Sequence, residues 1–270
     1  MLRVTALALC VGALPFIFNA GARAEEITSQ ETQTGSKWLD DPHQHVGLTY
    51  SASAKFQTAY LWRGIYVGAL NTQLDASIGY GGLYFEAWWN IGAEDWTFQT
   101  FQPEVDLILG FSRWGLNASA VFIHSFNCPF FDFGLHPGTP GNALEIDLRY
   151  TVSSKLPLSF LWATRVAAND GYLNEAGEAV RAFSSYAEVS YTQQLRDGFS
   201  LYYAFGITPW RSMYTGFERG FAVQNIEMRL SKAWSLSEHC GLSLTGQLSV
   251  SPMAKINVIN PNIALCIFLK

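Results

Sequence analysis

Apolar and polar residues alternate at every second position through most of this sequence. In residues 144–150 every even position is apolar and every odd position is charged. Residues 199–207 and 242–250 repeat the alternation with small or polar partners. Because successive side chains of a β-strand point to opposite faces, this pattern predicts strands with one apolar face and one polar or small-residue face.

The same alternation predicts about twelve antiparallel strands. They span residues 46–62, 71–80, 83–91, 102–112, 115–126, 143–152, 157–167, 182–194, 199–208, 221–232, 240–250 and 256–269. The connections alternate between short turns, such as Gly81-Gly82, and long loops, such as 127–142. Transmembrane barrels pair short periplasmic turns with longer external loops, and an even strand count puts both ends of the sheet on the periplasmic side. A secreted soluble β-sandwich, the competing fold, has no reason to alternate in this way.

The composition also favours a membrane. The chain has 270 residues, of which 49% are hydrophobic, 15% aromatic and only 14% charged, against roughly 25% charged in typical soluble domains. After residue 24 no stretch has the 18 or more apolar residues of a helical span. Since lipid admits only helices and closed barrels, we expect an up-and-down outer-membrane β-barrel.

The chain begins with a pattern typical of export. Arg3 precedes an apolar stretch, and Ala22-Arg23-Ala24 reads as a cleavage site, which predicts a signal peptide over residues 1–24. Residues 25–44 are polar without periodicity and are interpreted as a periplasmic tail, followed by the barrel from 45 to 270. Cleavage leaves 15 basic and 22 acidic residues, which disfavours a nucleic-acid partner.

Aromatic residues at both ends of the predicted strands are typical of interfacial girdles. Those on the outward face near the short turns are Tyr80, Phe111, Tyr150, Tyr191 and Phe199, and those near the long loops are Trp89, Phe101, Phe122 and Phe126.

The strand parity places a set of charged residues inside the barrel. As pore-lining candidates these are Lys55, Asp75, Glu86, Glu104, Asp106, Glu145, Asp147, Arg149, Arg165, Glu188, Glu227 and Arg229, with Arg63 at the outer mouth. Acids outnumber bases, which favours cations in the lumen. Alternatively, Arg149, Arg165 and Arg229 pair with Asp147, Glu188 and Glu227 across strands and close it, since twelve strands lie between filled barrels and wide porins.

Two long loops carry aromatic residues. The loop 127–142 contains Phe130, Phe131 and Phe133 and either folds into the mouth or packs over the rim. The loop 209–220 combines Trp210 with arginines, a mix that suits an aromatic or anionic ligand. These loops support the alternative function, a non-conducting barrel that binds a ligand or partner.

Cysteines and histidines suggest little further chemistry. If the last hairpin turns about Met253, Cys240 and Cys266 face each other and can form a disulfide, although Asn260-Pro261-Asn262 offers a competing turn. The pair His43 and His45 lies in the tail and is interpreted as solvated, so we expect no metal site. No cofactor motif and no nucleophile–histidine arrangement stands out, so no cofactor and no enzymatic activity are expected.

The segment Lys55-Phe56-Gln57-Thr58-Ala59-Tyr60-Leu61-Trp62-Arg63-Gly64, followed by Gln73-Leu74-Asp75-Ala76-Ser77, resembles the TorF-type porins. In that family of outer-membrane barrels a Tyr-x-Trp-Arg-Gly segment closes the first strand before a loop. The resemblance implies passive passage of small hydrophilic solutes, with Trp62 and Arg63 at the outer rim and Gly64 permitting the turn. The chain ends Phe268-Leu269-Lys270 rather than on the aromatic residue read by the assembly machinery.

Together these features predict a narrow, mildly cation-favouring outer-membrane channel. Its expected partners are outer-membrane lipid, the barrel-assembly and periplasmic chaperone machinery, and small hydrophilic solutes.

Overall fold

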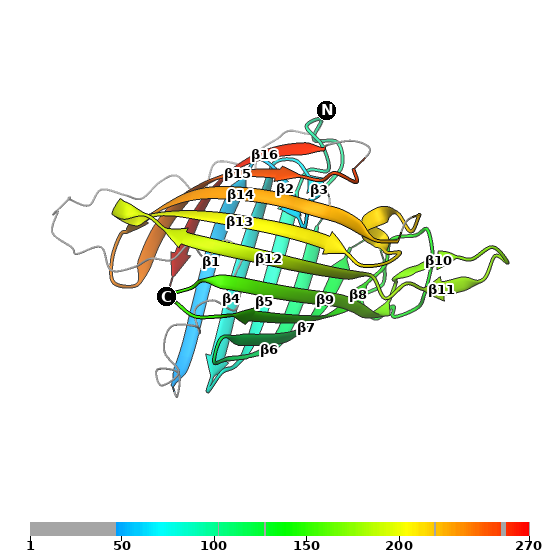
Figure 1. Cartoon of the computed structure of the whole chain (residues 1–270), viewed down its shortest axis with the longest axis horizontal. Helices are drawn as coiled ribbons and strands as arrows, with labels where there is room; N and C mark the ends of the chain where they lie inside the picture. The colour runs from blue at the N-terminus through cyan, green and yellow to red at the C-terminus, as the bar shows by residue number, and fades with distance from the viewer. Residues whose placement is uncertain (1–46, 102, 127, 219, 255–257, 270) are drawn as a thin grey trace, which may run out of the picture.

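The chain folds into a closed antiparallel β-barrel of twelve strands (Figure 1). The computed structural model describes residues 47–101, 103–126, 128–218, 220–254 and 258–269. The predicted signal peptide (1–24) and periplasmic tail (25–44) lie outside the described residues. The predicted fold class, a twelve-stranded antiparallel barrel, is confirmed.

The barrel strands follow one another around the wall in chain order, and β1 closes the sheet between β16 and β4. They are β1 (Leu48–Gln57), β4 (Asn71–Tyr80), β5 (Leu83–Gly92), β6 (Glu104–Arg113), β7 (Leu116–Ser125), β8 (Ala143–Thr151), β9 (Leu158–Ala168), β12 (Ser185–Gln194), β13 (Phe199–Thr208), β14 (Ala222–Ser235), β15 (Cys240–Val250) and β16 (Ile259–Leu269).

Four short strands lie outside this wall. β2 (Tyr60–Trp62) pairs with β3 (Ile65–Gly68), and β10 (Gly171–Leu173) pairs with β11 (Ala179–Arg181). Two three-residue 3₁₀ turns, η2 (Arg196–Gly198) and η3 (Met213–Thr215), complete the elements.

No helix in the described ranges is long and apolar enough to cross a membrane.

The connections divide the barrel into a short-turn end and a long-loop end. The short-turn end carries residues 81–82, 114–115, 152–157, 195–198 and 236–239, and the long-loop end carries the longer connections. Trp114 and Gly115 both have positive φ, 55° and 79°, as a two-residue hairpin loop requires to match the twist of its strands. Since β1 starts beside Tyr80 and β16 ends beside Ala52, the described chain enters and leaves at the short-turn end.

The first predicted strand differs from the structure. The sequence pattern predicts a single strand over 46–62, but the barrel strand β1 stops at Gln57 and residues 60–68 form the separate β2–β3 hairpin. The alternation continues through this segment because the hairpin is also a two-faced β-structure. Periodicity reports strand conformation and does not tell which sheet the strand joins.

The expected disulfide register is wrong. Cys240 pairs with Leu269, and Cys266 pairs with Ser243, three residues from the predicted alignment. The turn between β15 and β16 is therefore not centred on Met253. Cys266 is buried on the inner face, where Ser243 and Thr245 are also buried, whereas Cys240 has the opposite parity on β15. Both cysteines are free thiols.

The two faces of the wall have opposite polarity. Large apolar side chains are exposed on the outer face along the strands, among them Ile78, Leu109, Phe205, Ile226, Leu244 and Ile263. The predicted girdle residues Tyr80, Tyr150, Tyr191, Phe199, Trp89, Phe101 and Phe126 are exposed as well. Polar side chains are buried on the inner face, among them Gln73, Ser159, Ser190, Asn225, Thr245 and Asn262. This polarity is the reverse of that of a soluble domain.

If the apolar outer face lies against lipid, a charged side chain near the middle of a strand should destabilise the fold more than one near its end. Leu109, 62% exposed near the middle of β6, changed to arginine should lower the free energy of unfolding in lipid vesicles by about 2–4 kcal/mol. Tyr80→Arg, at the short-turn end of the same face, should cost at most about 1 kcal/mol. Equal costs at the two depths, measured by reversible denaturant unfolding, would contradict the orientation.

The observed register predicts that both strand cysteines stay reduced. Cys240 and Cys266 should each react with an alkylating reagent after unfolding without reductant, because their side chains have opposite parity in the β15–β16 pair. Peptide mass mapping is the measurement, and a disulfide-linked peptide joining the two residues would refute the register.

Candidate functional site

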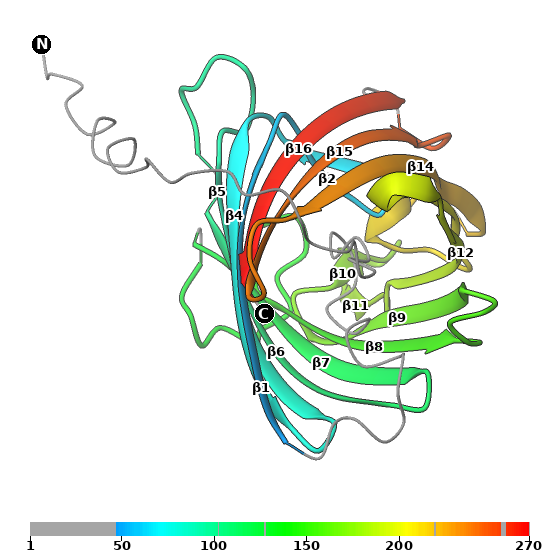
Figure 2. The same ribbon diagram turned by 90° about the vertical axis from the view of Figure 1, so that its left-hand side faces the viewer.

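The connection between β1 and β4 turns into the barrel (Figure 2). Its base is tied to the wall by main-chain contacts: the Thr58 amide donates to the Ile263 carbonyl at 3.0 Å, and the Ala69 amide donates to the Ala93 carbonyl at 2.8 Å. Between these points lies the β2–β3 hairpin, with Arg63 and Gly64 at its tip. Residues 60–62, expected as the end of the first strand, and residues 63–68, expected in an external loop, therefore form a hairpin inside the barrel.

Arg63 contacts the far wall instead of the outer mouth. Its Nη1 lies 2.9 Å from Oε1 of Glu145, and its Nη2 lies 3.1 Å from Oδ2 of Asp147, both on β8. Nη1 also donates to the Tyr214 hydroxyl at 2.8 Å. The Arg63 side chain is only 10% exposed. The expectation that Arg63 lies at the outer mouth is therefore wrong. Its guanidinium group lies inside the barrel, because it binds two carboxylates there.

The tip fits against the wall too closely for a larger residue. A Cβ at Gly64 would fall 2.3 Å from the Gln224 carbonyl oxygen, and the φ of Gly64 is +80°. Only glycine meets both requirements without strain. With Arg63 at φ +48°, the pair forms a two-residue hairpin turn of left-handed residues.

Aromatic contacts hold the flanks of the hairpin. The Tyr60 ring lies 5.7 Å from Trp88, and its hydroxyl donates to Oε1 of Glu104 at 2.8 Å. The Trp62 ring lies 5.6 Å from Tyr214. The hairpin thus bridges opposite sides of the wall.

Beneath the hairpin lies an internal cavity of about 330 Å³, called the chamber below. Its lining runs from Thr49 near the short-turn end to Trp62 in the hairpin. Eight of the thirteen charged candidates line it: Lys55, Arg63, Asp75, Glu86, Asp106, Glu145, Asp147 and Arg229.

The other five candidates also lie on the inner face. Glu104 contacts the hairpin through Tyr60, and the Arg165 guanidinium lies 5.7 Å from the Trp62 ring. Glu188 and Glu227 are buried. Arg149 shares the β8 face with Glu145 and stands opposite residues that are themselves buried, Asn117 and Leu161.

Of the predicted ion pairs, one forms among the described residues, and it lies within a single strand and not across strands. Glu227 pairs with Arg229 on its own strand and also accepts from Gln247 Nε2 at 2.9 Å. Glu188 accepts instead from two tyrosine hydroxyls, Tyr186 at 2.6 Å and Tyr202 at 2.9 Å. Asp147 forms its ion pair with Arg63. Tyrosine hydroxyls and a loop arginine replace the expected strand arginines.

The sequence pattern did not identify these tyrosines as inner-face residues, because tyrosine counts as apolar when strands are assigned from alternating polarity. Their positions in the strands could have indicated it. Tyr186 lies two residues from the inward-facing Glu188, and in the same way Trp88 lies two residues from Glu86. An amide network on the inner face was missed too, in which Gln57 donates to Asn71 at 2.9 Å and Asn262 donates to Gln247 at 3.1 Å. Tyr214, in a long loop, had no sequence signal.

Residues 128–142 of the expected loop pack over the rim, one of its two expected positions. Phe130 lies 5.3 Å from Phe122 and 4.8 Å from His124, and these two residues have the outward parity on β7, where Val121 and Ile123 are the buried inward pair. The loop therefore covers the outer wall and does not constrict the lumen.

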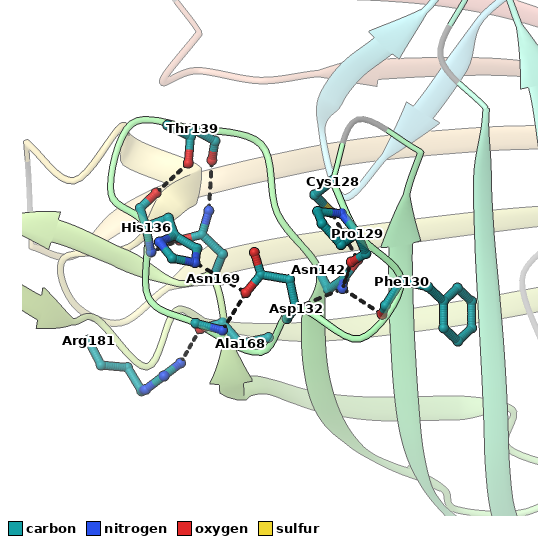
Figure 3. A network of polar contacts seen from close by, with 11 residues as sticks. Cys128, Pro129, Phe130, Asp132, His136, Thr139, Asn142, Ala168, Asn169 and Arg181 are labelled. Atoms are coloured by element: carbon teal, nitrogen blue, oxygen red, sulfur yellow. Dashed lines mark hydrogen bonds and ion pairs between the residues drawn. The ribbon is translucent and has the colours of Figure 1, made fainter.

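Asn142 holds this loop together (Figure 3). The side chain is fully buried, and its Nδ2 donates to the carbonyls of Pro129, Phe130 and Asp132 at 2.8–3.0 Å. Its Oδ1 accepts from Cys128 Sγ at 3.1 Å. In the same loop the amide of Gly134 donates to Asp132 and, with the neighbouring His136, lowers the pKa of that carboxyl group.

Residues 209–218 contact both the β2–β3 hairpin and the β10–β11 hairpin. Tyr214 reaches inward to Arg63, whereas the Arg211 guanidinium lies 4.8 Å from the Tyr172 ring on the β10–β11 hairpin. Tyr172 also stacks with Phe217 at 5.9 Å. No cluster of three or more metal-ligating residues occurs in the described ranges.

The Asn142 network predicts a local loss of structure on truncation. Asn142→Ala should destabilise the protein by roughly 1–3 kcal/mol, because it leaves several buried polar groups unpaired, and should make the 127–142 loop sensitive to protease. Asn174→Ala is the matched control, since that side chain bonds only within the exposed β10–β11 turn. Equal cleavage rates in the two variants would refute the role of Asn142.

Comparison with known proteins gives structural neighbours only. No protein-family model matches the chain, and no curated protein matches its sequence. Solved structures similar to it include the COG4313 outer membrane channel from Pseudomonas putida F1 (TM-score 0.46, 12% identity, covering 85% of this chain and 98% of that one). The KdgM porin (0.45, 7%, 82% and 98%) and the NanC porin (0.45, 9%, 82% and 98%) are also similar. At these values the likeness carries no argument about activity.

Proposed function

We propose that this protein is an outer-membrane channel for passive passage of small hydrophilic solutes, with a mild preference for cations. The observation that carries the proposal is the inverted polarity of the closed wall. Large apolar residues are exposed on the outer face, and charged and amide side chains surround a chamber of about 330 Å³ on the inner face. A closed barrel with this polarity satisfies its main chain in lipid and offers water a polar interior.

The cation preference rests on three carboxylates of the chamber. Asp75, Glu86 and Asp106 come from the adjacent strands β4, β5 and β6 and line the cavity together. Asp75 and Glu86 stand diagonally opposite each other on the paired strands β4 and β5. Glu86 is 2% exposed. A concentration of carboxylates inside a low-dielectric wall attracts cations and repels anions.

The competing function is a non-conducting barrel that binds a ligand or partner through its external aromatic loops. Two observations favour it: the β2–β3 hairpin crosses the lumen, and Tyr172, Phe217 and Arg211 gather at the rim. A barrel whose interior is permanently filled would carry no current, so conductance separates the two functions.

The membrane setting belongs to the same proposal. The apolar outer face suits outer-membrane lipid, and a barrel of this kind depends on periplasmic chaperones and the barrel-assembly machinery to reach it. The TorF-type resemblance of the segment around Trp62 and Arg63 is consistent with this assignment.

The test is single-channel recording of the refolded mature protein, with selectivity taken from reversal potentials in a salt gradient. Replacing all three acids, as Asp75→Asn, Glu86→Gln and Asp106→Asn, should lower the cation-to-anion permeability ratio by up to about tenfold, because the negative field of the chamber is lost. Discrete steps with this shift would support the channel.

The matched control is Glu178→Gln, a carboxylate that is exposed on the β10–β11 hairpin and bonds only to Asn174. It should leave the ratio unchanged. Steps without any change in the triple variant would refute the role of these acids. The absence of current from the folded wild-type protein and from every folded variant would refute the channel.

A further inference from the structure

We propose that the β2–β3 hairpin is a gate inside the barrel and that Arg63 is the latch that holds it closed. The inference rests on the proposed channel function and adds to it a mechanism of opening. It is carried by how the hairpin is attached, what its tip binds, and where it lies relative to the chamber.

The base of the hairpin is fixed, whereas its body is not part of the wall. Thr58 and Ala69 bond to the wall through their main chains. Between them, β2 and β3 pair only with each other and form a separate two-stranded sheet. Across the described residues, no main-chain hydrogen bond joins residues 60–68 to a barrel strand. The hairpin can therefore move without breaking any ladder of the barrel.

An isolated two-stranded hairpin is marginally stable, so its position depends on side-chain contacts. The tip contacts are the Arg63 bonds to Glu145, Asp147 and Tyr214. An apolar contact accompanies them, in which Trp62 and Ile65 pack against the cluster containing Tyr186 and Tyr214. Charge-assisted bonds of a buried guanidinium are the strongest of these interactions.

The hairpin separates the chamber from the long-loop end. Tyr60, Leu61, Trp62 and Arg63 all line the chamber, whose other limit is formed by the first residues of β1. Glu145 and Asp147, which receive the latch, are chamber residues as well. Displacement of the tip from β8 would join the chamber to the space under the long loops. It would also separate these two chamber carboxylates from the Arg63 guanidinium.

The latch predicts that either side of the contact can be broken with the same result. Arg63→Ala removes the guanidinium and its bulk. The double variant Glu145→Gln with Asp147→Asn keeps Arg63 in full size and removes the charges that hold it. Both variants should raise the open probability in single-channel recordings by about tenfold, the effect of losing one buried charge-assisted interaction.

Arg113→Ala is the matched control. Arg113 lies at the short-turn end, where its guanidinium stacks 4.4 Å from Trp114, away from the chamber lining. The Arg113→Ala variant should have the same open probability as the wild-type protein. Heat-modifiable migration in detergent shows that each variant is folded, and Arg63→Lys, which keeps one charge, should give an intermediate open probability.

The outcomes separate the gate from the channel. Higher open probability in both latch variants, including currents where the wild type carries none, supports the gate. A rise in Arg63→Ala alone overturns it, because Arg63 then only occupies space. If all variants show current steps of wild-type size and frequency, the gate is overturned and the channel is still supported. If the wild-type protein and every variant are folded but carry no current, both the gate and the channel are overturned.

A second measurement does not depend on current. Hydrogen exchange of the wild-type protein in nanodiscs should show amides of residues 60–68 exchanging faster than those of β1 and β4, and faster still in the latch variants. Exchange as slow as in the barrel strands, unchanged by either variant, would overturn the gate.

Discussion

Closure of the sheet is the constraint on which the rest of this structure depends. β1 pairs with β16 from Ala52 and Leu269 to Gln57 and Ala264, and it pairs with β4 along its whole length. The sheet therefore has no free edge, and the main-chain groups of every strand can find partners within the wall. Once the wall is closed, each strand has one face outside and one inside, and the alternation of the sequence becomes a separation between an apolar exterior and a polar interior.

The interior then has to satisfy many buried polar groups. The structure does this with networks that cross several strands. Glu188 is bonded by two tyrosines, Glu227 by Arg229, Gln247 and Asn225, and Asn262 by Gln57 and Gln247. Such bonds hold neighbouring strands in register, since buried polar groups without partners are costly. Asp75, Glu86 and Asp106 lie on the wall of the chamber.

Among the connections that the structure describes, the β2–β3 hairpin is the one that reaches the opposite wall by an ion pair. Glu145 and Asp147 stand two residues apart on β8 and would be a buried pair of like charges without Arg63. The hairpin supplies the compensating charge, and Gly64 allows its tip to reach the opposite wall. The same residues thus narrow the lumen and balance its charge.

The sequence by itself determined the wall of this protein. Period-two alternation is a local property, so the twelve strands, the short turns and the inward parity of charges such as Glu86 and Glu145 could be predicted from neighbours in the chain. Tertiary structure decided the rest, because it depends on contacts between residues far apart. Arg63 and Asp147 are separated by 84 residues, and no local pattern tells a loop arginine at the rim from one drawn inside. The register of β15 and β16, and with it the separation of Cys240 from Cys266, was likewise set by the pairing of whole strands and not by the residues of their turn.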